Sequence, residues 1–547
     1  LQPLSDIHFN EKYGAIENPA ASKTTLYYLM AIAAFLLLLA CINFINLTTA
    51  QSSQRAKEIG IRKTMGGTRF QLIGQFLSET FLVTLLAVVI SIGLVPVILN
   101  LFAEFISKDI KTALLFQPGP LTFIVLLVLV VTLISGFYPA MVLSKYKPVS
   151  VLKNEINATI GKSRNAWFRK SLTVTQFIVA QFFIMETVLV SKQLHYALNK
   201  NLGYKKDAIV FVVTPFFNHN SFSLKQVFFN KLKAIPQIAL VSQGEFPPSS
   251  GGMRGSDIRY LDGKKEVTTR VDMKFIDENY IYVYQIKLLA GRNLAISDTN
   301  KRTIINETFA NTLGFKNPND AVGKVVDLDQ QKMQIVGVTG DFYQQSLHDK
   351  IKPLAMIYHS STFNNNIFHL ALKPQTAEGD EWKTAIASVA KVWKQVYPDD
   401  DFDYQFYDDS IAKFYESDQH TSKLLGWSTG LAVLISCLGL MGLVIYNANL
   451  RVKEIGIRKV LGASARQIVV LLSTELVWLV IIAFVIVTPL AWWAMHKWMQ
   501  NFADRTSISW WIFAFSGAGM LLTTLFTLSF QTIKAAISNP VKSLRSE

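Results

Sequence analysis

The sequence predicts an α-helical membrane protein that carries a large α/β domain outside the bilayer. Half of its 547 residues are hydrophobic and only 17% are charged, whereas soluble domains carry about 25% charged residues. Seven stretches are apolar and long enough to cross a bilayer, which takes about 20 residues in a helix. One long stretch of mixed character, residues 194–421, separates the fourth of these from the fifth.

The seven expected spans are residues 26–49, 72–98, 120–143, 171–193, 424–447, 468–495 and 510–531. Each would form a helix, because a helix satisfies its own backbone hydrogen bonds, as a lipid environment demands. Aromatic pairs such as Tyr27-Tyr28 and Trp510-Trp511 stand near the ends of spans, as is typical of membrane interfaces. So apolar a chain needs a bilayer first, which excludes nucleic-acid binding as the reason for its net charge of +15.

The excess positive charge lies in four segments outside the spans. Residues 50–73, 144–170, 449–468 and 534–547 carry net charges of +4, +6, +4 and +2, whereas residues 194–421 are neutral overall. Short cytoplasmic loops are enriched in Lys and Arg. We therefore expect these four segments in the cytoplasm and residues 194–421 on the outer side.

This topology predicts seven parts of the chain. They are an outer segment (1–25), a three-helix transmembrane unit (26–143), a cytoplasmic linker (144–170), a single span (171–193), an outer domain (194–421), a second three-helix unit (422–533) and a cytoplasmic tail (534–547). The chain begins with Leu1 and shows no signal peptide, so we expect a longer protein.

The chain resembles itself at an offset of 396 residues. KEIGIRK stands at residues 57–63 and again at 453–459. Further matches are Arg55 with Arg451, Cys41 with Cys437, Gly66 with Gly462, Gln71 with Gln467, and Glu79 with Glu475. Seven identical residues in a row favour a shared role, although a duplicated topology without a role for the loop is the alternative.

Each copy has the pattern of a short amphipathic helix that stops at a glycine, within residues 55–66 and 451–462. Glu58 and Arg62 are four apart and can pair on one face, and Gly66 suits the position after a helix end. Thr68-x-x-Gln71 and Ser464-x-x-Gln467 match the capping box that starts a helix. We expect a stiff lever that docks into a groove on a partner; the alternative is topology signalling plus attraction to anionic lipid.

The chain resembles ABC-transporter permeases of the FtsX-like and MacB-like class, in the duplicated form common in Bacteroidota. The resemblance is carried by LQPLSDIHF (1–9), ACINFINLTTAQSSQRAKEIGIRK (40–63), RKSLTVTQF (169–177), QLHYALNKNLGY (193–204), LAGR (289–292), INETFANTLGF (305–315) and IVGVTGDFYQQSLH (335–348). It implies eight spans, of which seven are visible here, and it implies that residues 1–25 are the end of a first outer domain. It also implies a two-part MacB-like periplasmic core domain and a place in the bacterial inner membrane.

The resemblance further implies that the chain is a permease subunit of the mechanotransmission type and not itself an enzyme. Separate ABC ATPase subunits, two per chain, would bind ATP and Mg and drive movement of the periplasmic domain for export or extraction of a substrate. The ATPase-coupling residues would be Lys57, Glu58, Ile59, Gly60, Ile61, Arg62, Lys63, Gly66, Lys453, Glu454, Ile455, Gly456, Ile457, Arg458, Lys459 and Gly462. The resemblance does not name the substrate, and it leaves open whether a periplasmic adaptor or outer-membrane partner takes part. The alternative function is that of a non-transporting FtsX-type regulator.

The outer segment shows alternating strand-like and helical runs, which predict a mixed α/β domain. Expected strands are 208–213, 303–305, 333–338, 367–372 and 403–407, and expected helices are 223–234, 307–313 and 382–396. Helical runs at 186–200 and 408–423 would extend the adjoining spans outward as stalks.

Motifs for chemistry within the chain are weak. Gly161-Lys162-Ser163 ends like a Walker A loop, but Ile156 stands where the first glycine belongs, so we expect no cofactor in this chain. The eight histidines, His8, His195, His219, His348, His359, His369, His420 and His496, show no metal-ligand spacing, so we expect no metal site. Asp341 and His348 are seven apart, which favours a structural turn over an acid/base pair.

Three carboxylates, Glu79, Glu475 and Glu186, lie within apolar runs. Carboxylates inside a membrane suggest function by default, and these would be proton relays in a proton-coupled secondary transporter. Glu79 and Glu475 follow the capping boxes by about two turns, near the cytoplasmic interface. Hydrogen bonding between helices explains them at less cost, so we favour that interpretation.

Overall fold

The computed structural model describes the whole chain except residues 1–22, 104–109, 145–163, 216–220, 251–253, 263–264, 299–300, 329, 359–365, 376–378, 451–456, 459–460 and 538–547. The chain divides into two compact units. We call residues 1–191, 420–496 and 508–547 the membrane unit, and residues 192–419 and 497–507 the outer unit.

Seven helices of the described residues are long and apolar enough to cross a membrane, which confirms the seven expected spans. They are α1 (Lys23–Thr64), α2 (Arg69–Leu101), α3 (Pro118–Ser144), α6 (Arg164–Asn199), α13 (Glu416–Leu450), α15 (Ala465–Met499) and α16 (Trp510–Ile537), and a 3-10 helix η2 (Thr112–Phe116) precedes α3. Most are longer than a bilayer requires; α1 alone has 42 residues.

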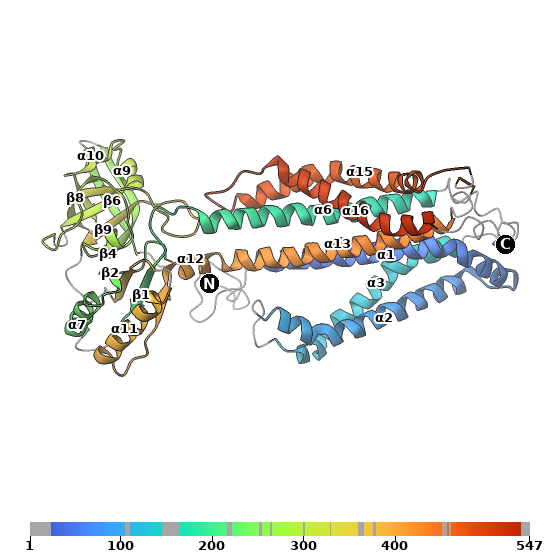
Figure 1. The fold of residues 1–547 in the computed structure, drawn as a ribbon, viewed down its shortest axis with the longest axis horizontal. Coiled ribbons are helices and arrows are strands. Elements are labelled where there is room, and N and C mark those ends of the chain that lie inside the picture. The colour runs from blue at the N-terminus through green and yellow to red at the C-terminus, as the bar shows by residue number, and fades with distance from the viewer. Residues whose placement is uncertain are drawn as a thin grey trace. The chain divides into compact units, whose positions relative to one another are not determined.

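The two halves of the membrane unit meet where α1 packs against α13 (Figure 1). The Asn43 side-chain amide donates to the carbonyl of Ile435 at 2.5 Å. Gly439 makes this approach possible, because a Cβ there would lie 1.9 Å from Asn43 Oδ1. Small residues and interhelical hydrogen bonds of this kind hold membrane helices together, since lipid leaves little hydrophobic driving force between them.

Helix α6 fills the centre of the second half. Phe177 and Ala180 are fully buried in a cluster with side chains of α13, α15 and α16. Gln176 Nε2 donates to the Ser436 carbonyl at 3.1 Å, and Gln181 Nε2 donates to the Val480 carbonyl at 3.3 Å. These buried amides fix the register of α6 on its neighbours.

The corresponding face of the first half carries a cavity of about 480 Å³ between α1, α2 and α3. Its lining includes the repeat equivalents of residues that α6 covers in the second half: Ala40 for Ser436, Phe44 for Leu440, Val83 for Leu479, Thr84 for Val480 and Ala87 for Ala483.

The outer unit contains two sheets, as expected for a two-part domain. The smaller one has the order β11-β1-β10-β2 with antiparallel neighbours. Its strands are β1 (Ile209–Val213), β2 (Ile238–Gly244), β10 (Ile367–Leu372) and β11 (Tyr404–Phe406), and its helices are α7 (Ser221–Lys233) and α11 (Glu381–Val396). The connectivity is a split β-α-β arrangement, and Phe228 and Trp393 bury one face of the sheet beneath the helices.

The larger sheet is inserted between β2 and β10 and has the order β5-β8-β6-β9-β4-β3-β7. Its strands are β3 (Arg254–Asp262), β4 (Lys265–Ile276), β5 (Leu288–Gly291), β6 (Arg302–Asn306), β7 (Val325–Leu328), β8 (Gln331–Thr339) and β9 (Leu354–Tyr358). The short helices α8 (Tyr280–Val283), α9 (Glu307–Thr312) and α10 (Pro318–Ala321) accompany it. One buried cluster, with Phe211 of β1 and Met356 of β9 among its members, joins the two sheets.

The five expected strands are confirmed as β1, β6, β8, β10 and β11, and the three expected helices as α7, α9 and α11. One expected stalk run, residues 186–200, lies within α6 except for its last residue, since α6 ends at Asn199. The other, residues 408–423, is broken at Tyr415, where α12 (Tyr407–Phe414) ends and α13 begins at Glu416. The fully buried Tyr415 side chain holds this break, because its hydroxyl accepts from the Leu347 backbone N–H at 2.9 Å.

Candidate functional site

The first repeated segment forms the C-terminal end of α1. A separate short helix was expected here, but α1 continues without interruption from Lys23 to Thr64. Gly60 is the only glycine between Ser52 and Thr64, and no proline interrupts this stretch. A single interior glycine costs only about 1 kcal/mol, too little to break a helix. The segment therefore continues its membrane span as one rod.

Both copies stop at their glycines with the same backbone geometry. Gly66 has φ +94° and Gly462 has φ +90°, a left-handed conformation that favours glycine. The N–H of Gly67 donates to the Arg62 carbonyl at 2.9 Å, and the N–H of Ala463 donates to the Arg458 carbonyl at 2.9 Å. These bonds across the glycine satisfy carbonyls left free at the helix end.

Both capping boxes are present. The Gln71 N–H donates to Thr68 Oγ1 at 3.4 Å, and the Thr68 N–H donates to Gln71 Oε1 at 2.9 Å. In the second copy the Gln467 N–H donates to Ser464 Oγ at 3.3 Å, and the Ser464 N–H donates to Gln467 Oε1 at 2.9 Å. In each copy the glycine is therefore followed directly by the capped start of the next long helix.

One face of the first segment is fixed to its own unit. Ile59 is buried against Leu72, Phe76 and Leu143. Lys63 Nζ donates to the Ser144 carbonyl at 2.7 Å, and partial burial together with the nearby Arg69 lowers the Lys63 pKa. The end of α1 is thus held against the ends of α2 and α3.

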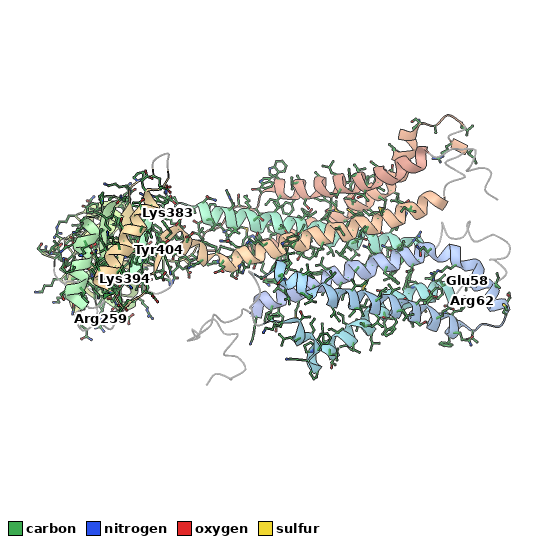
Figure 2. The ribbon with its side chains drawn as sticks, turned by 60° about the horizontal axis from the view of Figure 1, so that its bottom comes forward. Glu58, Arg62, Arg259, Lys383, Lys394 and Tyr404 are labelled. Atoms are coloured by element: carbon green, nitrogen blue, oxygen red, sulfur yellow. The ribbon has the colours of Figure 1, made fainter. Side chains whose placement is uncertain are left out.

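The predicted ion pair lies on the surface of the same segment. Arg62 contacts Glu58 at 2.7 Å, and both side chains are about half exposed (Figure 2). Arg62 also donates to Gln75 Oε1 of α2 at 2.7 Å. An exposed pair of this spacing is worth only about 0.3–0.5 kcal/mol, so its charges are available to a partner at little expense to the fold.

An exposed apolar patch lies next to this pair. Ile61 is 47% exposed, Met65 83% and Phe70 87%. In the second copy Ile457 and Leu461 are 53% and 80% exposed. Ile61, Met65, Ile457 and Leu461 lie outside the candidate spans, in basic segments that we expect in the cytoplasm, whereas Phe70 is the second residue of the candidate span Arg69–Leu101. Exposed apolar side chains gathered beside charged ones are a feature of interaction sites.

Phe70 was missed by the sequence reasoning. It stands at the second position of α2, where it reads as the start of an apolar span. The available signal was its place inside the capping box, between Thr68 and Gln71, and outside the expected span of 72–98. Its counterpart is Arg466, so the two copies differ here.

Parts of the candidate site lie outside the described residues. These are Lys453, Glu454, Ile455, Gly456 and Lys459 of the second copy, together with Gly161-Lys162-Ser163. The Lys57 side chain is not described either.

Two of the three carboxylates within apolar runs are paired between helices. Glu79 of α2 contacts Arg55 of α1 at 2.8 Å, and Glu475 of α15 contacts Lys170 of α6 at 2.8 Å. These pairs support the interhelical interpretation over a proton relay. Glu186 makes no ion pair or hydrogen bond with other residues that the structure describes.

The Asp341 carboxylate accepts from the Thr308 N–H and from Asn306 Nδ2, both at 2.9 Å. It therefore holds the start of α9 and is not paired with His348. Within the described part of the chain, no group of three His, Cys, Asp or Glu side chains is placed to hold a metal ion.

Comparison with known families decides the assignment of this architecture. The FtsX-like permease C-terminal family matches residues 30–148 and again residues 428–540. The MacB-like periplasmic core domain family matches residues 178–390. The chain is an FtsX-like ABC transporter permease. This permease is a multi-pass protein of the inner membrane, and its MacB-like domain is periplasmic.

Individual relatives agree with this assignment. The permease is 24% identical over 295 residues to the uncharacterized ABC transporter permease YknZ of Bacillus subtilis, a match that covers 52% of this chain and 72% of the relative. It is 29% identical over 140 residues to the macrolide export ATP-binding/permease protein MacB of Bdellovibrio bacteriovorus, covering 25% of this chain but only 20% of the relative. The chain therefore aligns with about a fifth of that MacB protein.

The periplasmic region of MacB from Actinobacillus actinomycetemcomitans is a similar solved structure. It is 17% identical, and the match covers 40% of this chain and 97% of that region with a TM-score of 0.28.

Proposed function

We propose that this permease binds two copies of a separate ABC ATPase through its two repeated segments and converts their ATP-driven movement into movement of its periplasmic domain. ATP and Mg would be bound by the ATPase. The outcome would be export or extraction of a substrate by mechanotransmission. The observation that carries the proposal is the repeated pair of segments, each of which leaves apolar side chains exposed in a basic stretch of the sequence.

The geometry of the segment supports a mechanical role. A docking surface on a flexible loop would absorb a partner's movement, whereas this surface lies at the end of the continuous helix α1. Ile59 and Lys63 tie that end to the neighbouring helices. A displacement applied at Met65 would therefore be passed to α1, α2 and α3 together.

The family assignment supports an ATPase partner. The relatives are ABC transporter permeases by name, and the MacB relatives are named as combined ATP-binding and permease proteins. This chain carries no complete Walker A motif. The ATP-binding part would therefore be a separate subunit, and the duplicated segments set the ratio at two ATPases per chain.

The test is capture of the cognate ATPase by the purified permease. Glu58→Lys together with Glu454→Lys reverses one charge in each copy, and we expect the ATPase to be lost. The matched control is Glu266→Lys with Asp320→Lys, which makes the same change in net charge at exposed positions of the periplasmic domain. Unchanged capture by the Glu58→Lys/Glu454→Lys variant would overturn the proposal.

A further inference from the structure

The segment Lys497–Ser507 contains the last three residues of α15 and most of the loop that leads to α16. It belongs to the outer unit although both helices belong mainly to the membrane unit. We call this segment the clamp loop. The sequence places it as a short link between the last two spans. In the structure it is bound to residues that are about 150 to 310 positions away in the chain.

Asp504 is the centre of these contacts. Its carboxylate accepts from the Tyr196 hydroxyl at 3.0 Å, contacts Lys200 Nζ at 3.1 Å and accepts a short hydrogen bond from the Tyr343 hydroxyl. Burial acts to raise the Asp504 pKa, but these three donors outweigh it and hold the pKa below its usual value. Hydrogen bonds to an ionised acceptor are about twice as strong as neutral ones.

Main-chain bonds hold the clamp loop along its length. The N–H groups of Ala503 and Asp504 both donate to the Leu347 carbonyl, at 2.9 and 3.1 Å. The fully buried Gln193 of α6 donates to the Asp504 carbonyl at 3.2 Å and accepts from the Thr506 N–H at 2.9 Å. Two parts of the outer unit therefore grip the loop backbone.

His348 forms the other end of the attachment. Its Nδ1 lies 3.0 Å from the Asn501 carbonyl and its Nε2 lies 3.0 Å from an Asp418 carboxylate oxygen of α13. Both neighbours accept hydrogen bonds, which fits an imidazolium that donates from both nitrogens. The ring stacks on Phe502 with 3.9 Å between centroids.

We propose that the clamp loop is a second mechanical attachment of the periplasmic domain, through which α15 delivers its movement to that domain. In this attachment Asp504 is the residue that keeps the clamp loop bound to the domain. Helix α15 starts at Ala465, directly after the second repeated segment, and ends at Met499 inside the clamp loop. Its 35 residues span about 50 Å at 1.5 Å per residue. A single helix thus connects the second repeated segment with the clamp loop, in addition to the connections to the domain through α6 and α13.

The inference rests on the proposed function, and one pair of measurements separates the two. The first measurement needs no ATPase. It uses the full chain in nanodiscs, with Cys41 and Cys437 replaced by Ser and with spin labels at Arg505→Cys and Lys383→Cys. The two labels report the distance between the clamp loop and the rest of the domain. We expect one narrow distance, which becomes broad when Asp504→Asn and Tyr343→Phe are added. Tyr282→Phe, at an exposed tyrosine of the same unit, is the matched control and leaves it narrow. A broad distance in the parent chain, or a narrow one in the Asp504→Asn/Tyr343→Phe chain, would overturn the inference.

The second measurement follows the ATP-dependent change in distance between a label at Lys383 and one at Leu86 of α2, with the cognate ATPase bound. We expect the Asp504→Asn/Tyr343→Phe chain to bind the ATPase and hydrolyse ATP but to lose most of this change. The full change in that chain would show that the clamp loop transmits nothing. Failure of the proposed function would be visible separately, as failure of the parent chain to bind the ATPase.

Discussion

Phe70 offers the sharpest test of the docking surface. Its side chain is 87% exposed, so nearly all of its apolar surface is available to a partner. Complete burial of a phenylalanine side chain is worth about 1.5–3 kcal/mol. Truncation in Phe70→Ala should therefore weaken binding of the ATPase roughly 10- to 100-fold, since each 1.4 kcal/mol is a factor of ten.

The same truncation should leave the permease itself intact. Surface substitutions away from special features change stability by about 0.5 kcal/mol or less. The matched control is Phe116→Ala, because Phe116 is 63% exposed in η2, which lies at the opposite end of α3 from Ser144.

The assay is the dissociation constant of the cognate ATPase for the permease in nanodiscs, with the melting temperature of each variant measured alongside. We expect a weaker Kd for Phe70→Ala at an unchanged melting temperature, and wild-type values for Phe116→Ala. An unchanged Kd for Phe70→Ala would refute the reasoning, because it would show that Phe70 is not part of the docking surface.

Three further predictions concern the glycine stop, the periplasmic domain and the paired carboxylates. Gly66→Ala forces a left-handed alanine and should destabilise the chain by about 1–2 kcal/mol. The control Gly74→Ala adds a Cβ that meets no atom within 4 Å, so it should be neutral or stabilising. Equal melting temperatures for the two variants would contradict this. Complete burial lowers the pKa of His369 to about 3, below the usual value near 6.5. Between these two pH values the folded state therefore binds fewer protons than the unfolded state. The stability of the fold should fall as the pH drops from 6.5 toward 3. His369→Gln should flatten that dependence of the melting temperature, and an unchanged slope would argue against it. Glu79→Gln with Glu475→Gln removes two exposed pairs worth about 0–1 kcal/mol each and should leave ATP-dependent movement of the domain intact; movement that instead requires these carboxylates and a proton gradient would favour a secondary transporter.

The sequence predicted the elements whose signal is local. All seven spans were found because each is a continuous apolar run, and β10 was found at its exact bounds because Ile367–Leu372 is buried throughout. The long strands β3 and β4 were missed. Charged and threonine residues fill much of Arg254–Asp262 and Lys265–Ile276, and their pairing is fixed by partner strands that the local pattern does not show.

The candidate site was partly predictable for the same reason. The glycine stops, the capping boxes and the Glu58–Arg62 pair depend on residues a few positions apart, and the structure contains all of them. The continuity of α1 was not expected, because the change from apolar to basic sequence suggested a boundary that the backbone does not have. The clamp loop joins Asp504 to Tyr196 across 308 positions, and such contacts exist only once the chain has folded.

The most direct test of the account is photo-crosslinking from the two docking segments. A benzophenone amino acid placed at Met65 should capture the cognate ATPase in native membranes, and so should one placed at Leu461. A chain that carries it at both positions should yield one permease chain joined to two ATPase subunits. No ATPase adduct from either position, or labelling of Cys at position 65 by a membrane-impermeant maleimide added to the periplasmic side, would contradict it.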